Sequence, residues 1–554
     1  MGAYRRGVAG EPAAGRHALT PPRATPDAPG QRRVSRGQQV LDAIERAGNR
    51  LPDPVLIFVW LIAAVIALSV VGAAAGWEAV NPVTQQHIRA TSLLASGNLE
   101  RLFVEMPRTL TGFAPLGYVL LVMLGAGIAE RTGLAGAAMR AAVRGAPTTW
   151  LTPIVIFVSV MANQAADAAF VVMIPLAGAL YAAAGRHPIV GIAASFAGVA
   201  GGFSANLLPG QLDALLLGIT EPAAQLLAPD WKMNIAGNWY FIAGMTFFMV
   251  PLGWFITERV VAPRFGEWTP TAEAPVAAVG TDLTAAEKRG LRAASLGALG
   301  VVVLFALLVW PAVWSGVDGG APLFDEPAAA NGGGVQALQP FFQSLVAAFF
   351  LLFLVTGVAY GRAAGVNRGH RDEIRMISEG MASMSYYIVM AFVAAHFVAL
   401  FNWSNLGVIL AINGAAGLGT LELPAPVLVA AIVVLAASIN LVIGSASAKW
   451  GMLAPVLVPM LMLLGISPEM TTAAFRMGDS VTNPITPLLV YFPLVLVFCQ
   501  RWVPGFGMGS LIAAMLPYSL GFLVIGLLMT AGWVFFDLPV GPGAAVRYVV
   551  PGLR

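Results

Sequence analysis

Apolar runs about as long as a bilayer is thick recur along this chain, and they constrain its fold more than any other feature. A helix needs roughly 20 apolar residues to cross the hydrocarbon core. Runs of this kind lie at about residues 54–76, 110–131, 188–208, 237–260, 293–314, 337–360, 376–401, 468–499 and 507–535. Charged residues make up only 11% of the chain, against roughly 25% in a soluble domain. The sequence therefore predicts an all-α integral membrane protein with about nine transmembrane helices.

Two further apolar stretches carry polar residues near their centres and do not fit as simple spans. They cover about residues 150–185 and 424–465. The first is interrupted by Asn163, Gln164 and Asp167, and the second by Asn440 and residues 444–450. Since the bilayer core offers no water to a polar tip, such a tip must lie in protein or in a watery cavity. The sequence therefore predicts two re-entrant helical hairpins. Residues 404–423, before the second hairpin, are predicted as a short helix or a broken continuation of the preceding span.

Each predicted hairpin is followed by an apolar span that small, polar and proline residues interrupt. The interruptions lie at residues 201–209 and 479–487. Proline removes a helical hydrogen bond and frees backbone groups. In secondary transporters, interrupted spans in two corresponding halves mark the substrate and ion site. Basic residues concentrate in alternate loops, while the loops at residues 77–108, 209–236 and 314–336 carry few. By the positive-inside rule the N-terminus is cytoplasmic, the C-terminus is outside, and the hairpins enter from opposite sides as an inverted repeat.

This pattern divides the chain into five predicted regions. They are an Arg/Pro/Gly-rich cytoplasmic tail (1–50), a first transmembrane repeat with the first hairpin (51–260), a cytoplasmic linker (261–292), a second repeat with the second hairpin (293–543) and a C-terminal tail (544–554). The first apolar run is too long for a signal-peptide core. It is predicted to stay as the first span of a multi-pass protein of the bacterial cytoplasmic (inner) membrane.

Ionisable side chains within a membrane are costly and therefore mark functional candidates. Four stand in the hairpins and broken spans: Asp167, Lys449, Arg476 and Asp479. Either aspartate can exchange a proton or offer the hard oxygen that sodium prefers. The alternative is that each aspartate forms a buried ion pair with Lys449 or Arg476. Sequence alone leaves both open.

Neutral polar residues complete the candidate set. The substrate-binding candidates are Asn163, Asn440, Ser447, Trp450, Arg476, Pro468 and Pro487, and the ion-coupling candidates are Asp167, Asp479, Asn206, Asn483 and Ser445. A sodium ion, if it is the coupling ion, is expected near Asn163, Asp167, Asn206, Asp479 and Asn483. The amides and hydroxyls can equally form ordinary interhelical hydrogen bonds. Trp450 can stack on an aromatic substrate or serve as a packing residue, and the two prolines shape helix starts and breaks.

Several functional classes find no support in the sequence. The chain has no GxxxxGK[ST] loop of an ATPase, and its single Cys499 and scattered histidines lack metal-ligand spacing. Its basic residues form no single stripe for nucleic acid. A secondary active transporter, driven by a proton or a sodium gradient through alternating access, explains the twin broken spans best. An intramembrane enzyme with Asp167 and Asp479 as a carboxylate pair, and a gated channel, are the alternatives.

At these same segments the sequence resembles the AbgT (p-aminobenzoyl-glutamate) transporters. The resemblance covers residues 51–543. Its most specific stretches are residues 111–117, 163–175, 203–210, 402–406, 443–459 and 465–493.

The resemblance implies transport of p-aminobenzoyl-glutamate or related folate precursors and catabolites, with export of sulfonamide antimetabolites by some members. It implies a bowl-shaped homodimer with nine spans and two hairpins per protomer, an inner core at the dimer contact and an outer core holding the hairpins. Separately from the resemblance, no cofactor is predicted beyond a coupling ion, either sodium or a proton. Family positions carried over onto this chain are Asp167, Asn440, Ser447, Trp450, Pro468, Arg476, Asp479 and Pro487.

Overall fold

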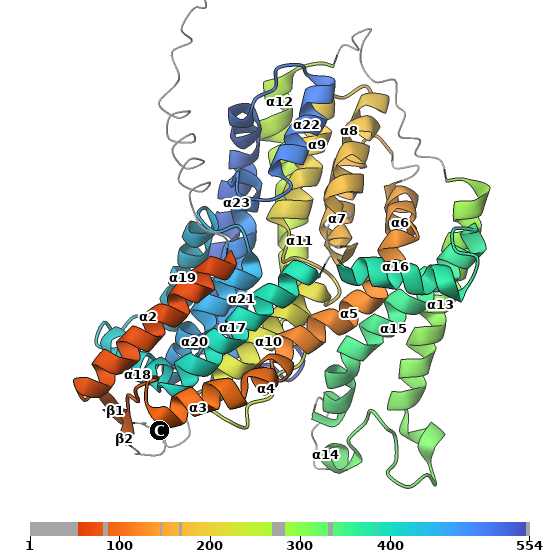
Figure 1. The fold of residues 1–554 in the computed structure, drawn as a ribbon. Helices are drawn as coiled ribbons and strands as arrows, with labels where there is room; N and C mark the ends of the chain where they lie inside the picture. Colours follow the sequence, from red (N-terminus) through yellow and green to blue (C-terminus); the bar gives the residue numbers. More distant parts are fainter. Residues whose placement is uncertain are drawn as a thin grey trace, which may run out of the picture.

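The computed structural model describes residues 54–80, 87–143, 147–165, 169–268, 283–330, 336–382 and 384–549, and these are almost entirely helical (Figure 1). Within these ranges the strands are β1 (Glu78–Val80) and β2 (His87–Arg89), a short antiparallel pair. The predicted all-α fold class is confirmed. The N-terminal tail predicted for residues 1–50 lies outside the described residues.

The helices follow the apolar runs in chain order. The first half contains α2 (Pro54–Ala74), α3 (Ser96–Val104), α4 (Met106–Thr111), α5 (Ala114–Arg131), α6 (Leu134–Val143), α7 (Leu151–Met161), η1 (Ala162–Ala165), η2 (Ala169–Met173), α8 (Ile174–Ala183), α9 (Pro188–Phe196), η3 (Ala197–Gly201), α10 (Gln211–Gln225), α11 (Trp239–Ile256), η4 (Thr257–Val261) and α12 (Ala262–Phe265). The second half contains α13 (Ala285–Val309), η5 (Pro311–Trp314), α14 (Glu326–Ala330), η6 (Gln336–Leu338), α15 (Gln339–Ala364), α16 (His370–Ala382), α17 (Ser385–Trp403), α18 (Leu406–Gly419), α19 (Ala425–Asn440), α20 (Ala446–Leu463), α21 (Pro468–Val481), η7 (Asn483–Ile485), α22 (Phe492–Trp502) and α23 (Met508–Phe535).

The long helices agree with a protein that crosses a membrane several times. Among the described residues, 7 helices are long and apolar enough to span a bilayer, or 8 if α5 and α6, which meet at a bend of 69°, form one span. Two predicted spans, at residues 188–208 and 468–499, are divided by their polar interruptions into shorter helices. The count of nine spans therefore remains a prediction.

Two predicted boundaries are wrong. The span placed at residues 376–401 joins the end of α16 to α17, which begins only at Ser385, because the apolar residues of the amphipathic α16 extend the hydropathy signal backwards. The loop placed at residues 209–236 contains α10, a helix of 15 residues. Its acidic residues and short length hide it from a search for bilayer-length runs, but it packs inside the protein against α5, α20 and α21.

Both predicted hairpin segments consist of two helical arms with a break at the polar residues. Hairpin 1 comprises α7, the 3₁₀ turn η1, the π-helical turn η2 and α8; hairpin 2 comprises α19 and α20. The arms α7, α8 and α19 are shorter than a bilayer-spanning helix. The predicted short helix before hairpin 2 is α18.

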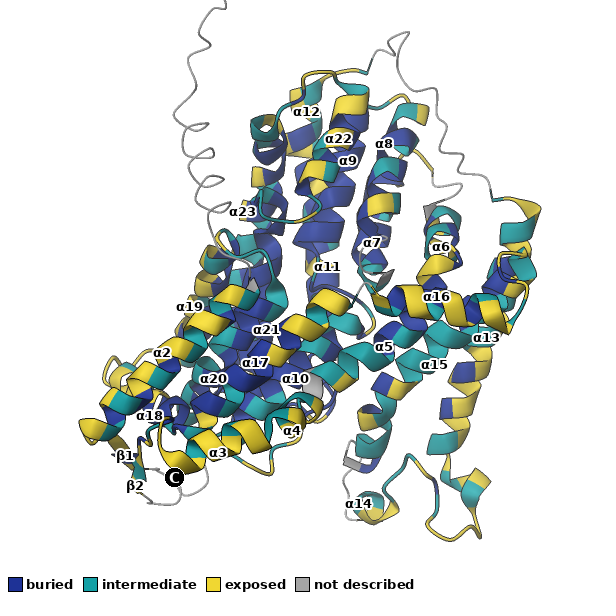
Figure 2. Ribbon diagram, viewed as in Figure 1, coloured by how far each residue is buried: buried dark blue, intermediate teal, exposed yellow. Residues whose placement is uncertain are grey.

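The main hydrophobic core lies among α7–α11 and α19–α23, where Figure 2 shows the densest burial. By contrast, α13 stands at one side of the molecule in Figure 1, and only 17% of its bilayer-length window is buried. The predicted C-terminal tail begins within a packed segment, since Val546 is buried and its carbonyl accepts a hydrogen bond from the Ser467 amide at 2.9 Å. The helices that carry the candidate residues are therefore the best-packed part of the fold.

Candidate transport site

The two broken spans meet at their breaks. After α9 the chain passes through the π-helical turn η3 into irregular backbone, and after α21 it passes through the 3₁₀ turn η7. The turns η3 and η7 pack against each other. The Asn483 Nδ2 donates to the Ala200 carbonyl at 3.3 Å, and the Ser204 amide donates to Ser480 Oγ at 3.1 Å. Side chains thus satisfy backbone groups that a continuous helix would pair itself.

Asn440, the last residue of α19, connects hairpin 2 to the second break. Its side chain is fully buried. The Nδ2 donates to the Asp479 carbonyl at 2.7 Å, to Thr482 Oγ1 at 2.9 Å and to Asn483 Oδ1 at 2.8 Å. The amide oxygen accepts from the Lys449 ammonium. One buried amide therefore joins α19, α20, α21 and η7.

Lys449 and Asp479 form a buried ion pair between α20 and α21. The exposed fractions of their side chains are 0% and 3%. A charge buried in this way is tolerated only with a partner, because removing either side chain leaves the other unpaired in a medium of low dielectric constant. We refer to Asn440, Lys449 and Asp479 as the central cluster.

A second buried ion pair joins Arg476 to Asp213, with 2.7 Å between Nη1 and Oδ1. Asp213 lies in the first turn of α10, where its other oxygen accepts from the Gly210 amide at 2.8 Å. Arg476 also reaches the Asn238 amide oxygen, at 3.5 Å. Arg476 is therefore occupied by protein partners in this conformation.

Trp450 is fully buried and packed. Its ring stacks on Phe475 with 4.3 Å between centroids, and its Nε1 donates to Thr220 Oγ1 at 2.8 Å. A solute ring has no access to the indole in this conformation. Of the two interpretations of Trp450, packing is the one that this geometry fits.

The polar residues around the tip of hairpin 1 bind backbone. Asn163 Nδ2 donates to the Gly202 carbonyl at 3.1 Å, and Asn206 Nδ2 donates to the Val160 carbonyl at 3.4 Å. Gln164 Nε2 donates to the Leu208 carbonyl at 2.6 Å. Asp167 lies outside the described residues, so its predicted role remains a prediction.

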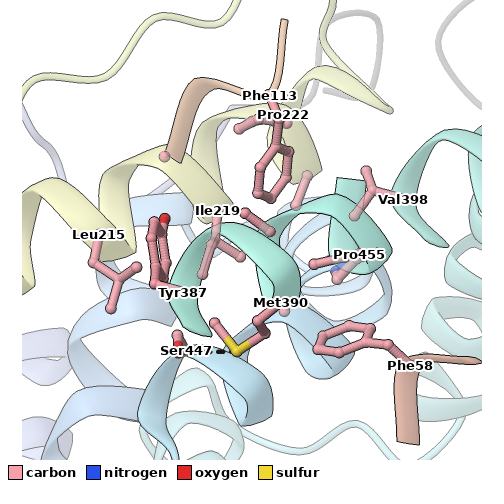
Figure 3. A pocket seen from close by; sticks show the side chains of 15 residues that line it. Phe58, Phe113, Leu215, Ile219, Pro222, Tyr387, Met390, Val398, Ser447 and Pro455 are labelled. Carbon is pink, nitrogen blue, oxygen red and sulfur yellow. Dashed lines mark hydrogen bonds between the residues drawn. The ribbon is translucent and has the colours of Figure 1, made fainter. Parts of the chain in front are cut away.

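Ser445 and Ser447 lie at the start of α20. Ser445 Oγ accepts from the Ala448 amide at 3.3 Å as the helix cap. Ser447 lines a narrow cavity among α2, α10, α17 and α20, where its hydroxyl approaches the Met390 sulfur at 3.8 Å (Figure 3). The other cavity walls are mostly apolar, with Phe58, Ile219 and Tyr387 among the side chains that line them.

This arrangement can be compared with known proteins. Residues 39–548 match the AbgT transporter family. This chain belongs to the AbgT family. A p-aminobenzoyl-glutamate transport protein of Escherichia coli (strain K12) is 34% identical over 504 residues, which is 91% of this chain and 96% of that protein.

Two solved structures of similar proteins support the fold. The Alcanivorax borkumensis YdaH transporter has 43% sequence identity and a TM-score of 0.82, covering 89% of this chain and 100% of that chain. Neisseria gonorrhoeae MtrF, whose structure is described with a class of antimetabolite efflux pumps, has 39% identity and a TM-score of 0.83, covering 91% and 100%. This AbgT family chain is therefore a multi-pass membrane transport protein and not an enzyme.

The structure brings together part of the predicted AbgT site. The sequence left open whether each aspartate forms a buried ion pair. Asp479 does, and its partner is Lys449. Two of the oxygens predicted to bind sodium are engaged by other groups of the protein. Asn483 Oδ1 accepts a hydrogen bond from Asn440, and Asn206 Oδ1 accepts one from the Leu208 amide at 3.2 Å. Within the described part of the chain, no group of three His, Cys, Asp or Glu side chains is placed to hold a metal ion.

The predicted prolines lie at helix starts and breaks. Pro468 is the first residue of α21, and Pro487 follows the turn η7. Asp213 and Thr220 escaped the sequence reasoning. The sequence did contain a sign of a helix start at Asp213. Pro209 and Gly210 break the chain just before it, and an acidic residue soon after such a break is typical of a helix N-terminus.

Proposed function

We propose that this chain is a secondary active transporter of p-aminobenzoyl-glutamate or a related folate precursor or catabolite, driven by a proton or a sodium gradient through alternating access. The central cluster carries the proposal, because it places a buried ion pair where hairpin 2 contacts a broken span. Paired broken segments near the bilayer midplane are where secondary transporters bind solute and ion.

The ion pair supplies a coupling device. Protonation of Asp479, or a sodium ion at its carboxylate, removes or shields the negative charge that holds Lys449. Since Lys449 belongs to α20 and Asp479 to α21, loss of the attraction releases the hairpin arm from the broken span. A gradient of either ion can then drive one state over the other.

The cavity beside Ser447 holds only about 20 Å³ in this conformation, and we propose it as the site for the aminobenzoyl ring in a conformation in which it widens (Figure 3). Its apolar walls suit a ring, and hydroxyls of Ser447 and Tyr387 suit the polar ends. The Tyr387 hydroxyl is buried and has no hydrogen-bond partner among the described residues. Ile219→Trp fills this space, so binding of labelled p-aminobenzoyl-glutamate is expected to weaken; unchanged binding contradicts this placement.

Arg476 is the proposed partner of a substrate carboxylate or sulfonyl oxygen, reached when its pair with Asp213 opens. Guanidinium groups match such oxygens in shape and charge. Arg476→Ala is expected to abolish both solute binding and transport. Loss of transport with solute binding unchanged counts against direct contact.

Export of sulfonamide antimetabolites is the second candidate, favoured by the similarity to MtrF. Import and export use the same architecture, so direction is a property to be measured. The decisive experiment is proteoliposome flux of labelled p-aminobenzoyl-glutamate and of a sulfonamide under separate proton and sodium gradients. Accumulation that neither gradient changes overturns secondary transport. Flux that is never concentrative supports a gated channel instead.

We also propose a homodimer in the bacterial inner membrane with a cytoplasmic N-terminus. Asp230 lies exposed after α10, and Glu267 lies exposed after α12, on predicted opposite sides. The native Cys499 is buried and gives little background. Asp230→Cys is expected to react with an impermeant maleimide from outside whole cells, and Glu267→Cys only after permeabilisation. The reverse pattern overturns the orientation, and cross-linking in membranes tests the dimer.

A further inference from the structure

Glu469 is a buried carboxyl that the proposed mechanism does not use. It is the second residue of α21 and is 5% exposed. Its Oε2 has no hydrogen-bond partner among the described residues. An unpaired carboxylate is costly to bury, whereas a protonated carboxyl is neutral and can donate a hydrogen bond. Such a group within a membrane transporter calls for a functional explanation.

Glu469 begins a line of polar side chains on one face of α21. Thr472 and Arg476 follow it at intervals of three and four residues, which places all three on the same side of the helix. The facing helix α10 contributes polar partners: Thr220 Oγ1 lies 2.9 Å from Thr472 Oγ1, and Asp213 pairs with Arg476. Arg476 lies about 10 Å along the axis from Glu469, and Asp479 follows one turn later. We refer to this line as the α10–α21 seam.

A small polar cavity lies along the seam. It is lined by Asp213, Asn234, Gly237, Asn238, Thr472 and Arg476 together with apolar side chains. Its wall reaches Glu469, because Asn238 Nδ2 donates to the Glu469 carbonyl at 2.8 Å and a Cβ at Gly237 would lie 3.3 Å from Glu469 Cγ. Polar cavities of this kind hold water that bridges neighbouring groups. The cavity holds about 10 Å³, room for a single water, and a water there would connect the Glu469 region to the Arg476–Asp213 pair.

The charged groups around Glu469 leave it without a counter-ion. They are Glu221 on α10, which is a like charge, Lys232 after α10, Arg476 two turns further along α21, and Arg547, whose backbone pairs with Ile466. Lys232 approaches Glu221 at 4.0 Å, and Arg547 pairs with Asp537 at 3.4 Å. The Trp231 indole N–H and the Glu469 backbone amide point toward the carboxyl and favour its ionised form, but the indole lies outside hydrogen-bond geometry with Oε2. No described lysine or arginine forms an ion pair with Glu469.

We propose that Glu469 is a proton-binding site of the transport cycle, exchanging protons with one aqueous side and, through water in the α10–α21 seam, with the Arg476–Asp213 region. In this step the carboxylate takes a proton from hydronium and releases water, and the reverse step returns the proton to water. No other bond changes. The inference rests on the proposed function and selects the proton as a coupling ion.

The test uses proteoliposomes with wild type, Glu469→Gln, Glu469→Asp and the matched control Asp230→Asn, which neutralises an exposed carboxylate in the neighbouring segment. Wild type and the control are expected to accumulate labelled p-aminobenzoyl-glutamate under a proton gradient. Glu469→Gln is expected to lose that accumulation but to keep exchange of internal for external solute, which needs no net proton movement.

Each other outcome has a distinct meaning. If Glu469→Gln accumulates solute with the same pH profile as wild type, the inference is wrong. It is also wrong if Glu469→Gln loses solute exchange together with accumulation. Wild-type accumulation that follows sodium alone overturns it while secondary transport stands; accumulation that follows neither ion overturns the proposed function itself. If Glu469→Gln fails to fold, Glu469→Asp is tested instead, because it keeps the carboxyl group on a side chain that is one methylene shorter. The pH of half-maximal uptake is then expected to shift, and an unchanged pH overturns the inference.

Discussion

Around the tip of hairpin 1, the described polar side chains are amides that donate to backbone carbonyls, whereas hairpin 2 meets its broken span through a buried lysine, aspartate and asparagine. Both regions consist of two helical arms with a break between them, but the chemistry at the break differs. Neutral hydrogen bonds to backbone hold one geometry with little dependence on ionisation. A buried ion pair responds to every change of charge.

In the proposed alternating-access cycle, this difference would give the two regions different roles. The broken span that hairpin 2 contacts carries Asp479, the group whose charge a proton or sodium ion can change, whereas the described residues of hairpin 1 are neutral. The two meet where η3 packs on η7. The same substitution made in each hairpin therefore tests whether the two regions have different roles.

Lys449→Met is expected to have the largest effect. It leaves the Asp479 carboxylate buried without its partner, and breaking a buried pair from one side costs about 3–5 kcal/mol. Thermal unfolding in detergent measures this loss. Adding Asp479→Asn removes the orphan charge, so the double variant is expected to regain stability without regaining gradient-driven transport. A single variant as stable as wild type contradicts a structural ion pair.

Asn440→Ala and Asn163→Ala compare the same side chain in the two hairpins. Asn440 serves Asp479, Thr482, Asn483 and Lys449, so its loss is expected to cost about 2–3 kcal/mol. Asn163 makes one hydrogen bond to backbone and is half-buried, so its loss is expected to cost about 1 kcal/mol. Denaturant unfolding of both variants measures the difference. Equal costs contradict the division between hairpins.

Much of this comparison follows from sequence, because it depends on local features. The polar interruptions predict the two hairpins and breaks, and the costliness of membrane charges identifies Lys449, Arg476 and Asp479. Even the Lys449–Asp479 pair was among the alternatives, since both residues fall within neighbouring apolar segments.

What sequence could not predict depends on contacts between distant segments. Asp213 and Arg476 are separated by 263 positions, and only packing of α10 on α21 unites them. The short, partly acidic α10 resembles a loop in a hydropathy search. Trp450 stands beside a polar tip in sequence, yet its partners Phe475 and Thr220 come from other helices and bury it.

An effect as small as that of Asn163→Ala is expected from Gly210→Ala, which tests hairpin 1 through its steric fit. A Cβ at Gly210 would lie 2.0 Å from Gln164 Oε1, so the flexible glutamine side chain must move and give up its hydrogen bond to the Leu208 carbonyl. The backbone is extended here, with φ of −156°, and adds no strain of its own. The expected cost is about 1 kcal/mol.

A double-mutant cycle isolates that contact. In a Gln164→Ala background there is no side chain to displace, so Gly210→Ala is expected to cost almost nothing further. Gly507→Ala is the control, because Gly507 is also an extended residue before a helix and a Cβ there meets nothing within 4 Å. If Gly210→Ala lowers the free energy of unfolding equally in both backgrounds, the contact with Gln164 does not stabilise the tip of hairpin 1. If the two substitutions are coupled in stability while the proton dependence of transport stays as in wild type, hairpin 1 contributes geometry. The response to charge then belongs to the contact between hairpin 2 and its broken span.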